Sequence, residues 1–288
     1  MLLDAAERAR LERLAVASRG RVRGMWTGRH RSLRLGESLD FADYREYHPG
    51  DDFRRIDYNL WARLGVVLIR LFEAEDELPL RIVIDPSQSM AFGAKFRTAQ
   101  RLAAMVAYLA LSSGERVRLM TVPAADRPAH NGPWARHVGR WHEMERWLED
   151  LEPSGGTDLP GAARLLAPQG SGRGPAVLIS DLLAPGWDQC LDAIGALGGG
   201  VVLHVLSPAE LDPDLTGDVT LRDAETGAEV AVSLSGDAVS RYRERADGFV
   251  AEVARRSLRA GMDHVLVIAD EGALDTALRD LVGKGTFR

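Results

Sequence analysis

The stretch RIVIDPSQSM, residues 81–90, decides the fold and raises the question of function. Its apolar run, IVI, is short and continuous, which is typical of a strand covered on both faces of a sheet. The run ends directly on Asp85, and Ser87 and Ser89 follow at alternate positions. Alternate residues of an extended turn can face one point. The stretch therefore predicts a buried strand that brings one carboxylate and two hydroxyls to a common site.

Short apolar runs alternate with helical patterns from residue 80 onward. Segment 96–110, for example, repeats apolar residues at three- and four-residue steps. This alternation predicts an α/β fold with a doubly wound, mostly parallel sheet between helices, and the turn in 218–234 predicts an inserted β-hairpin. The expected strands are 80–85, 116–122, 176–181, 201–207 and 264–269, and the other expected helices are 142–151, 160–167, 188–197, 238–260 and 272–282.

The beginning of the chain differs in charge from the rest. Residues 1–63 hold 13 arginines and 10 acids, which gives +3, so a total of −6 leaves −9 for the remainder. A short helix is expected at 3–17 and a β-like run at 66–75. We expect residues 1–79 to form an appendage packed on an α/β core of residues 80–288. The basic run from Arg19 to Arg34 is interpreted as a solvated or internally paired surface, or as an anion site.

Composition excludes several classes of protein. Hydrophobic residues make up 45% and charged residues 27%, as in an ordinary soluble globular protein, and the negative net charge argues against general affinity for nucleic acid. Cys190 is the only cysteine, so no disulfide framework is expected and a cytoplasmic location is predicted. No uncharged apolar run reaches the roughly 20 residues of a transmembrane helix. Acids and arginines near the start argue against a signal peptide.

Two further loops carry oxygen ligands. SGGTDLPG, residues 154–161, offers Thr157 just before a predicted helix, and LISDLL, residues 178–183, places Asp181 at the end of a predicted strand. In a doubly wound sheet, ligands bind beyond the carboxyl ends of the strands. Hydroxyl and carboxylate oxygens suit Mg²⁺, with Mn²⁺ or Ca²⁺ as alternatives. The sequence thus predicts a metal site, unless Asp85 and the serines only cap the following helix.

The order of these motifs resembles a known site. D-x-S-x-S, then a threonine in a GGT loop, then an aspartate after a strand is similar to the metal-ion-dependent adhesion site of von Willebrand factor A domains, which have a Rossmann-like core. The resemblance implies that the hydroxyls bind the ion directly and the carboxylates largely through water. It also implies an open position for an acidic side chain of a partner. The matching residues are Asp85, Ser87, Ser89, Thr157 and Asp181.

A second stretch, REYHPGDDFRRIDYNLWAR (45–63), resembles a bacterial family, the domain of unknown function 58. Members have a von Willebrand factor A-like core and are typically encoded beside MoxR-type AAA+ ATPases. Many also carry membrane-spanning helices before this region. The signature is interpreted as a clasp that fixes the appendage to the core, or as a partner surface. The matching residues are Arg45, Tyr47, Gly50, Asp51, Asp52, Arg54, Ile56, Asp57, Ala62 and Arg63, while Tyr58 stands where tryptophan is more frequent.

Three functions follow from these patterns. The first is a metal-dependent protein-interaction module, an adaptor or substrate-recruiting partner of a MoxR-type AAA+ ATPase. The second is a Mg²⁺-dependent hydrolase or phosphoryl-transfer enzyme that uses Asp85 or Asp181. It is disfavoured because no general base, lysine or arginine accompanies the metal loops in sequence, so no catalytic residue is assigned. The third is a scaffold whose site has lost its metal. Client and oligomeric state stay open.

Overall fold

The computed structural model divides into a large unit, Met1–Trp26 with Leu78–Arg288, and a small unit, Thr27–Glu77. Each unit is described by itself. The structure describes residues 1–18, 41–48, 51, 53, 56–72, 79–124, 127–166, 174–214, 217–224 and 227–284.

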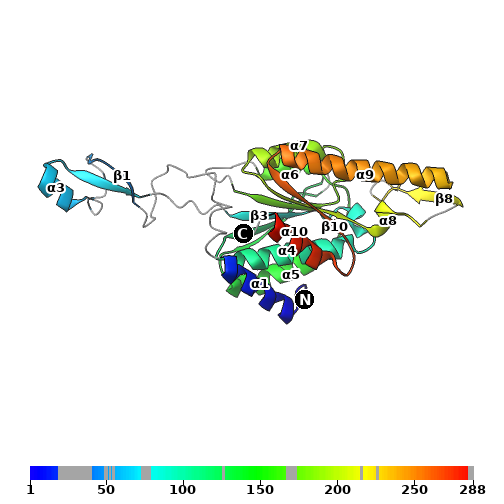
Figure 1. The fold of residues 1–288 in the computed structure, drawn as a ribbon, viewed down its shortest axis with the longest axis horizontal. Coiled ribbons are helices and arrows are strands. Elements are labelled where there is room, and N and C mark those ends of the chain that lie inside the picture. The colour runs from blue at the N-terminus through cyan, green and yellow to red at the C-terminus, as the bar shows by residue number, and fades with distance from the viewer. Residues whose placement is uncertain are drawn as a thin grey trace. The chain divides into compact units, whose positions relative to one another are not determined.

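The large unit is built on a six-stranded sheet with the order β10-β7-β6-β3-β4-β5 (Figure 1). All neighbouring strands are parallel except β4 and β5, which confirms the predicted doubly wound, mostly parallel sheet. The chain moves outward from β3 to β4 in one direction and from β6 to β7 in the other, so the topological switch point lies between β3 and β6. The strands are β3 (Leu80–Ile84), β4 (Val117–Thr121), β5 (Asn131–Ala135), β6 (Ala176–Ser180), β7 (Gly200–Leu206) and β10 (Met262–Ile268).

Helices cover both faces of this sheet (Figure 1). Ile82 and Ile84 of β3 belong to the core that contains residues of α4, α5 and α10, whereas Val83 belongs to the core that contains residues of α6, α7 and α9. This alternation is what a strand buried on both faces requires. The helices are α4 (Lys95–Ser112), α5 (Trp141–Glu149), α6 (Leu159–Leu166), α7 (Trp187–Ala196), α8 (Pro208–Leu211), α9 (Gly236–Arg259) and α10 (Ala273–Gly283), with short 3-10 helices at Gln88–Ala91 and Val138–Arg140.

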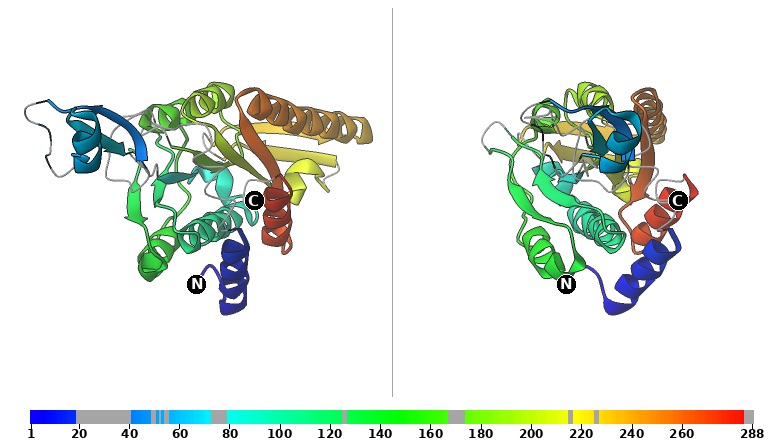
Figure 2. Two further views of the ribbon diagram at one scale, coloured as in Figure 1. Left: turned by 60° about the vertical axis from the view of Figure 1, so that its left-hand side comes forward. Right: turned by 90° about the vertical axis from the view of Figure 1, so that its left-hand side faces the viewer.

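Helix α1 (Ala5–Ser18) lies on the same face of the sheet as α4 and α10 (Figure 2). Leu11 and Ala15 are buried in the core of the large unit, and Arg101 of α4 forms an ion pair with Glu7 at 2.5 Å. The structure therefore differs from the expected appendage of residues 1–79. Residues 1–26 are assigned to the large unit because α1 buries its apolar side chains there.

The predicted strands and helices of the core are confirmed to within two residues at their ends. The inserted hairpin is also confirmed, since β8 (Gly217–Arg222) pairs antiparallel with β9 (Glu229–Leu234). The sequence does not predict the edge strand β5, because Gly132 and Pro133 interrupt its pattern. Proline is tolerated on an edge strand, and a Cβ at Gly132 would lie 2.7 Å from the Trp147 ring. Among the helices of the described ranges, none has the length and apolarity to cross a membrane.

The small unit contains one antiparallel strand pair and one short helix. Strand β1 (Phe41–Glu46) pairs with β2 (Leu68–Phe72), and α3 (Tyr58–Leu64) lies between them in sequence. Buried Asp57 caps α3, because its Oδ1 accepts hydrogen bonds from the backbone N–H groups of Asn59 and Leu60. The Tyr44 hydroxyl donates to the other oxygen of this carboxylate at 3.0 Å. Asp57 of the signature thus has a local structural role.

Other described residues of the signature make local contacts. Asp51 accepts a hydrogen bond from the backbone N–H of His48 at 2.8 Å, and the Tyr47 N–H donates to the backbone of Val67 at 2.9 Å. Arg63 is exposed in the last turn of α3. The signature residues Gly50, Asp52 and Arg54, and the side chain of Arg45, lie outside what the structure describes, so the role of the signature as a clasp or a partner surface stays a prediction.

Candidate metal centre

Two of the predicted ligands lie side by side at the switch point of the sheet. Asp85 follows β3 and Asp181 follows the neighbouring strand β6. The Asp85 N–H donates to the backbone oxygen of Ile179 at 2.9 Å, which continues the pairing of the two strands. The Ser180 hydroxyl donates to Asp85 Oδ2 at 2.7 Å. Ser180, which the sequence analysis does not single out, therefore fixes the Asp85 carboxylate beside the Asp181 loop.

The loop that carries Thr157 is joined to the loop that follows Asp85. Backbone hydrogen bonds of 2.8 Å run from Gln88 N–H to the Gly155 oxygen and from Ser154 N–H to the Pro86 oxygen. Arg127 strengthens the same junction, because its Nη1 donates to the backbone oxygen of Ser154 at 2.5 Å and to its hydroxyl at 2.9 Å. The five predicted site residues thus occupy three adjoining loops.

The hydroxyls of the site have few partners within the protein. Ser87 Oγ and Ser89 Oγ lie 3.1 Å apart, and the Ser87 N–H donates to Asp85 Oδ1 at 3.1 Å. Thr157 Oγ1 is buried and has no hydrogen-bond partner in the described part of the chain. Buried polar atoms almost always have a partner, and an exception points to a bound water or ion. The Thr157 hydroxyl is therefore available as a ligand.

Electrostatics at Asp85 favour a cation. Its carboxyl is completely buried, and this burial together with the nearby Asp181 carboxylate raises its pKa to about 6. Hydrogen bonds from Ser180 and Ser87 oppose the shift but do not cancel it. The Asp181 carboxylate repels the ionised carboxylate of Asp85. A divalent cation would remove this repulsion.

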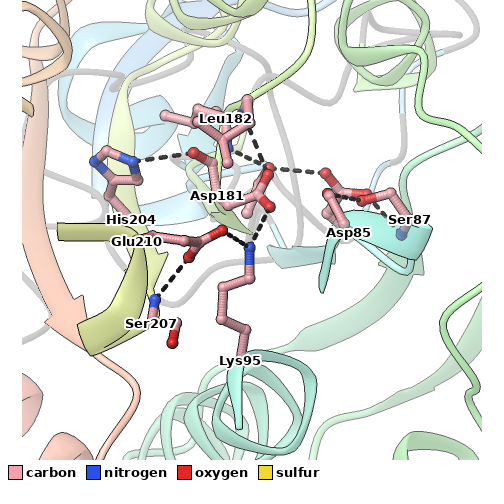
Figure 3. Close-up of polar contacts among 11 residues, drawn as sticks. Asp85, Ser87, Lys95, Asp181, Leu182, His204, Ser207 and Glu210 are labelled. Carbon is pink, nitrogen blue, oxygen red and sulfur yellow. Dashed lines mark hydrogen bonds and ion pairs between the residues drawn. The ribbon is translucent and has the colours of Figure 1, made fainter. Parts of the chain in front are cut away.

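The Asp181 carboxylate is held at both oxygens (Figure 3). Oδ2 accepts from Lys95 Nζ at 2.8 Å, and Oδ1 accepts from the Leu183 N–H at 3.2 Å. The backbone oxygen of Asp181 lies 3.0 Å from His204 Nε2, so this histidine of β7 is a bonded core residue, as its apolar surroundings in sequence indicate. The next residue, Leu182, is buried with φ of 56°, a backbone conformation that non-glycine residues rarely adopt and that occurs mainly at functional sites.

Lys95 is the residue of this region that sequence reasoning missed. The inference that no lysine or arginine accompanies the metal loops is wrong in space, since Lys95 bonds Asp181 across 86 positions and Arg127 joins two of the loops. Lys95 is fully buried and also pairs with Glu210 Oε1 at 2.5 Å. No local pattern predicts these contacts, because their partners come from distant segments.

The capping alternative does not agree with the structure. Helix α4 begins at Lys95, and its N-cap residue is Ala94, with no side-chain capping bond among the described residues. Asp85 instead accepts hydrogen bonds from Ser87 and Ser180. These side chains are therefore ordered for a purpose other than starting α4.

The donor set fits a hard dication. The described residues contain no group of three or more His, Cys, Asp or Glu side chains suited to a metal, so any ion here would depend on hydroxyl oxygens as well as carboxylates. Mg²⁺ and Ca²⁺ prefer oxygen ligands, and Mg²⁺ often retains several waters. The orphaned Thr157 hydroxyl and the crowded Asp85 carboxylate meet these requirements.

The fold is that of an α/β protein with a doubly wound, mostly parallel sheet, and the candidate site lies at the switch point of that sheet. The family described as "Protein of unknown function DUF58" matches residues 43–253, and the chain belongs to this family.

Relatives of this chain occur in mycobacteria. An uncharacterized protein of Mycobacterium tuberculosis (strain H37Rv) is 31% identical over 258 residues, which cover 86% of this chain and 80% of that protein. An uncharacterized protein of Mycobacterium bovis matches with the same identity and coverage. An uncharacterized protein of Mycobacterium avium is 39% identical over 85 residues, which cover 29% of this chain and 50% of that protein.

Solved structures show weaker similarity. The conserved hypothetical protein BatB of Bacteroides thetaiotaomicron is 16% identical with a TM-score of 0.45, covering 72% of this chain and 98% of that one. An aerotolerance-related membrane protein of Bacteroides fragilis is 16% identical with a TM-score of 0.42, covering 72% and 99%. A von Willebrand factor type A structure from Catenulispora acidiphila is 18% identical with a TM-score of 0.36, covering 49% and 35%.

Proposed function

We propose that the protein is a metal-dependent protein-interaction module and an adaptor or substrate-recruiting partner of a MoxR-type AAA+ ATPase. The observation that carries the metal-dependent part is the buried Thr157 hydroxyl without a hydrogen-bond partner in the described chain, in a loop bonded to the loop of Ser87. Leaving such a group unsatisfied costs about 1–3 kcal/mol. A ligand that satisfies it removes this cost.

The site side chains would bind Mg²⁺, or Mn²⁺ or Ca²⁺ in its place, in two different ways. The hydroxyls of Ser87, Ser89 and Thr157 are the proposed direct ligands, and the carboxylates of Asp85 and Asp181 balance the charge, largely through water. When bound, the ion supplies an electrophilic centre for an acidic side chain of the partner. Neutral direct ligands leave most of the ionic charge available to that acid.

The two carboxylates are fixed before any ligand arrives. Ser180 holds Asp85 at 2.7 Å, and Lys95 and the Leu183 N–H hold both oxygens of Asp181. Mutation of a group that orients a metal ligand typically lowers metal affinity by about 10–100-fold. Such preorganisation lowers the cost of binding an ion and a partner.

The ATPase link rests on the resemblance of the signature in 45–63. One structural feature supports a partner-facing role for this region. Tyr58, Trp61 and Leu64 of α3 are 57%, 47% and 61% exposed, and they recur at three-residue steps along one helix. Clustered exposed apolar side chains mark interaction surfaces. A cytoplasmic location is part of the proposal, because the ATPase partners act there and Cys190 is a free, buried thiol.

A Mg²⁺-dependent hydrolase or phosphoryl-transfer enzyme is the second candidate. Arg127 favours it, since Nε and Nη2 of this side chain are buried and have no partner among the described residues. Lys95 argues against it, because Asp181 and Glu210 already engage its ammonium group, which is then not free to bind phosphate or to transfer a proton. A scaffold with a degenerate site is disfavoured by the adjoining positions of all five site residues.

Binding assays with a MoxR-type ATPase test the proposal. The full chain, Thr157→Val and the matched control Thr157→Ser are compared in Mg²⁺ and in EDTA. Wild type and the serine variant, which keeps the hydroxyl, are expected to bind in Mg²⁺ only, and the valine variant in neither. Binding by all three that ignores EDTA contradicts the proposal. Metal-dependent hydrolysis of a phosphoester or peptide, lost in Thr157→Val, would favour the enzyme.

A further inference from the structure

Lys95, Asp181 and Glu210 form an ion network at the candidate metal centre (Figure 3). Lys95 Nζ lies 2.8 Å from Asp181 Oδ2 and 2.5 Å from Glu210 Oε1, and the three side chains are 0%, 2% and 18% exposed. Glu210 belongs to α8 and is not among the predicted ligands. Burying an ammonium group costs several kcal/mol of solvation unless its partners repay it. A lysine in this position therefore requires both of its carboxylates.

Glu210 is held so that it cannot easily leave Lys95. Its Oε2 accepts a hydrogen bond from the Ser207 N–H at 2.8 Å, within a capping box at the start of α8. Its backbone oxygen accepts from the Tyr242 hydroxyl of α9 at 2.7 Å. The position of the ammonium group is thus fixed from two sides.

We propose that Lys95 is the built-in counter-ion of the metal centre, and that its charge, balanced by Glu210, sets how weakly the isolated protein holds a divalent ion. This inference rests on the proposed metal site and deepens it. With a cation already at Asp181, the loops keep their arrangement without metal. The same charge repels an incoming dication, so tight binding needs the additional acid of the partner.

The charges around the site predict whether each substitution raises or lowers the affinity for a dication. Three carboxylates (Asp85, Asp181 and Glu210) and one ammonium group (Lys95) sum to −2 when all are ionised, and a neutral residue at 95 makes the sum −3. A neutral residue at 210 makes it −1. Removing the charge of Lys95 should therefore raise the affinity for a dication, and removing the charge of Glu210 should lower it. A merely structural role for the ion pair would instead weaken binding in both variants.

The test measures Mn²⁺ affinity of the full chain by electron paramagnetic resonance, without any partner. Lys95→Met is expected to bind Mn²⁺ roughly tenfold tighter or more, and Glu210→Gln several-fold weaker, because a unit charge within a few ångströms of a dication has effects of this order. Lys284→Met is the matched control, since Lys284 is exposed and is the other lysine of the chain. Its affinity should equal that of wild type.

Thermal unfolding of the same proteins adds a second readout. Lys95→Met should lose stability in EDTA and recover it in Mn²⁺, whereas wild type should gain less than Lys95→Met from the same concentration of Mn²⁺. If Lys95→Met does not fold in EDTA, the double variant Lys95→Met/Glu210→Gln decides. Its charge sum is again −2, so its Mn²⁺ affinity should return to that of wild type, whereas a merely structural role of the ion pair would leave it as weak as Glu210→Gln. Shifts of both variants in the same direction, unchanged affinities, or no Mn²⁺ uptake by wild type and Lys95→Met overturn the inference. Opposite shifts combined with EDTA-insensitive partner binding would contradict the proposed function and leave this inference standing.

Discussion

Replacement of Thr157 by valine distinguishes the free energy lost by burying its hydroxyl from the contribution of that hydroxyl to metal binding. The Oγ1 atom is buried without a partner in the described chain, and such an atom costs about 1–3 kcal/mol. Valine has nearly the same shape and no polar atom. In EDTA, the free energy of unfolding of Thr157→Val should therefore rise by about 1 kcal/mol. For a domain of this size, this raises the melting temperature by about 3 °C.

Binding of Mg²⁺ should cancel the higher stability of Thr157→Val. At a Mg²⁺ concentration ten times the dissociation constant, an ion that binds only the folded state adds about 1.4 kcal/mol to wild type. Thr157→Val lacks one direct ligand and should gain almost nothing, so the two proteins become about equally stable. Chemical denaturation with and without Mg²⁺ measures both quantities, and Thr157→Ser should respond to Mg²⁺ as wild type does. The reasoning is refuted if Thr157→Val is less stable than wild type in EDTA, or gains as much from Mg²⁺.

Three further predictions concern pH, the small unit and the sheet. The folded state raises the pKa of Asp85 from its ordinary 3.8 to about 6. Ionisation of Asp85 therefore does not destabilise the folded state below pH 3.8, and it destabilises that state fully above pH 6. Metal-free wild type should thus lose about 3 kcal/mol between pH 4 and 7 relative to Asp85→Asn, and equal pH slopes in denaturation would argue against the buried charge. Asp57→Ala should destabilise the small unit by about 1–2 kcal/mol through the lost cap, seen as faster amide exchange in α3; unchanged exchange would contradict this role. Gly200→Ala should cost about 3 kcal/mol or more, because its Cβ would lie 1.8 Å from the Ala176 oxygen, whereas Gly236→Ala, with no atom within 4 Å, should cost little.

Much of the core could be predicted because its signals are local. Strand β3 is a continuous apolar run that ends on Asp85, and α4 repeats apolar residues at helical steps, so each element is visible in one window of sequence. The edge strand β5 has no such window, since it contains Gly132 and Pro133 and only Ala135 of its five residues is buried. The position of α1 was also not predictable, because its partners in α4 lie about 90 residues away.

The candidate site also has a part that could be predicted from the sequence and a part that could not. The proximity of Asp85 and Asp181 was predictable because parallel strands end at one edge of a sheet, so polar residues after β3 and β6 must lie close together. Lys95 was not, because it stands at the start of a helix where a lysine is usually solvated. Its burial depends on Asp181 and Glu210, which come from two other segments. Charge balance of a buried site is a property of the tertiary structure.

Anomalous diffraction from crystals of the full chain soaked in Mn²⁺ tests the central claim most directly. The account predicts one strong peak at the switch point of the sheet, in contact with the hydroxyl oxygens of Ser87, Ser89 and Thr157 at about 2.0–2.3 Å. Asp85 and Asp181 should lie just outside these contacts. No peak at this point in wild type, or a peak that persists unchanged in crystals of Thr157→Val, would contradict the claim that these loops hold a metal ion.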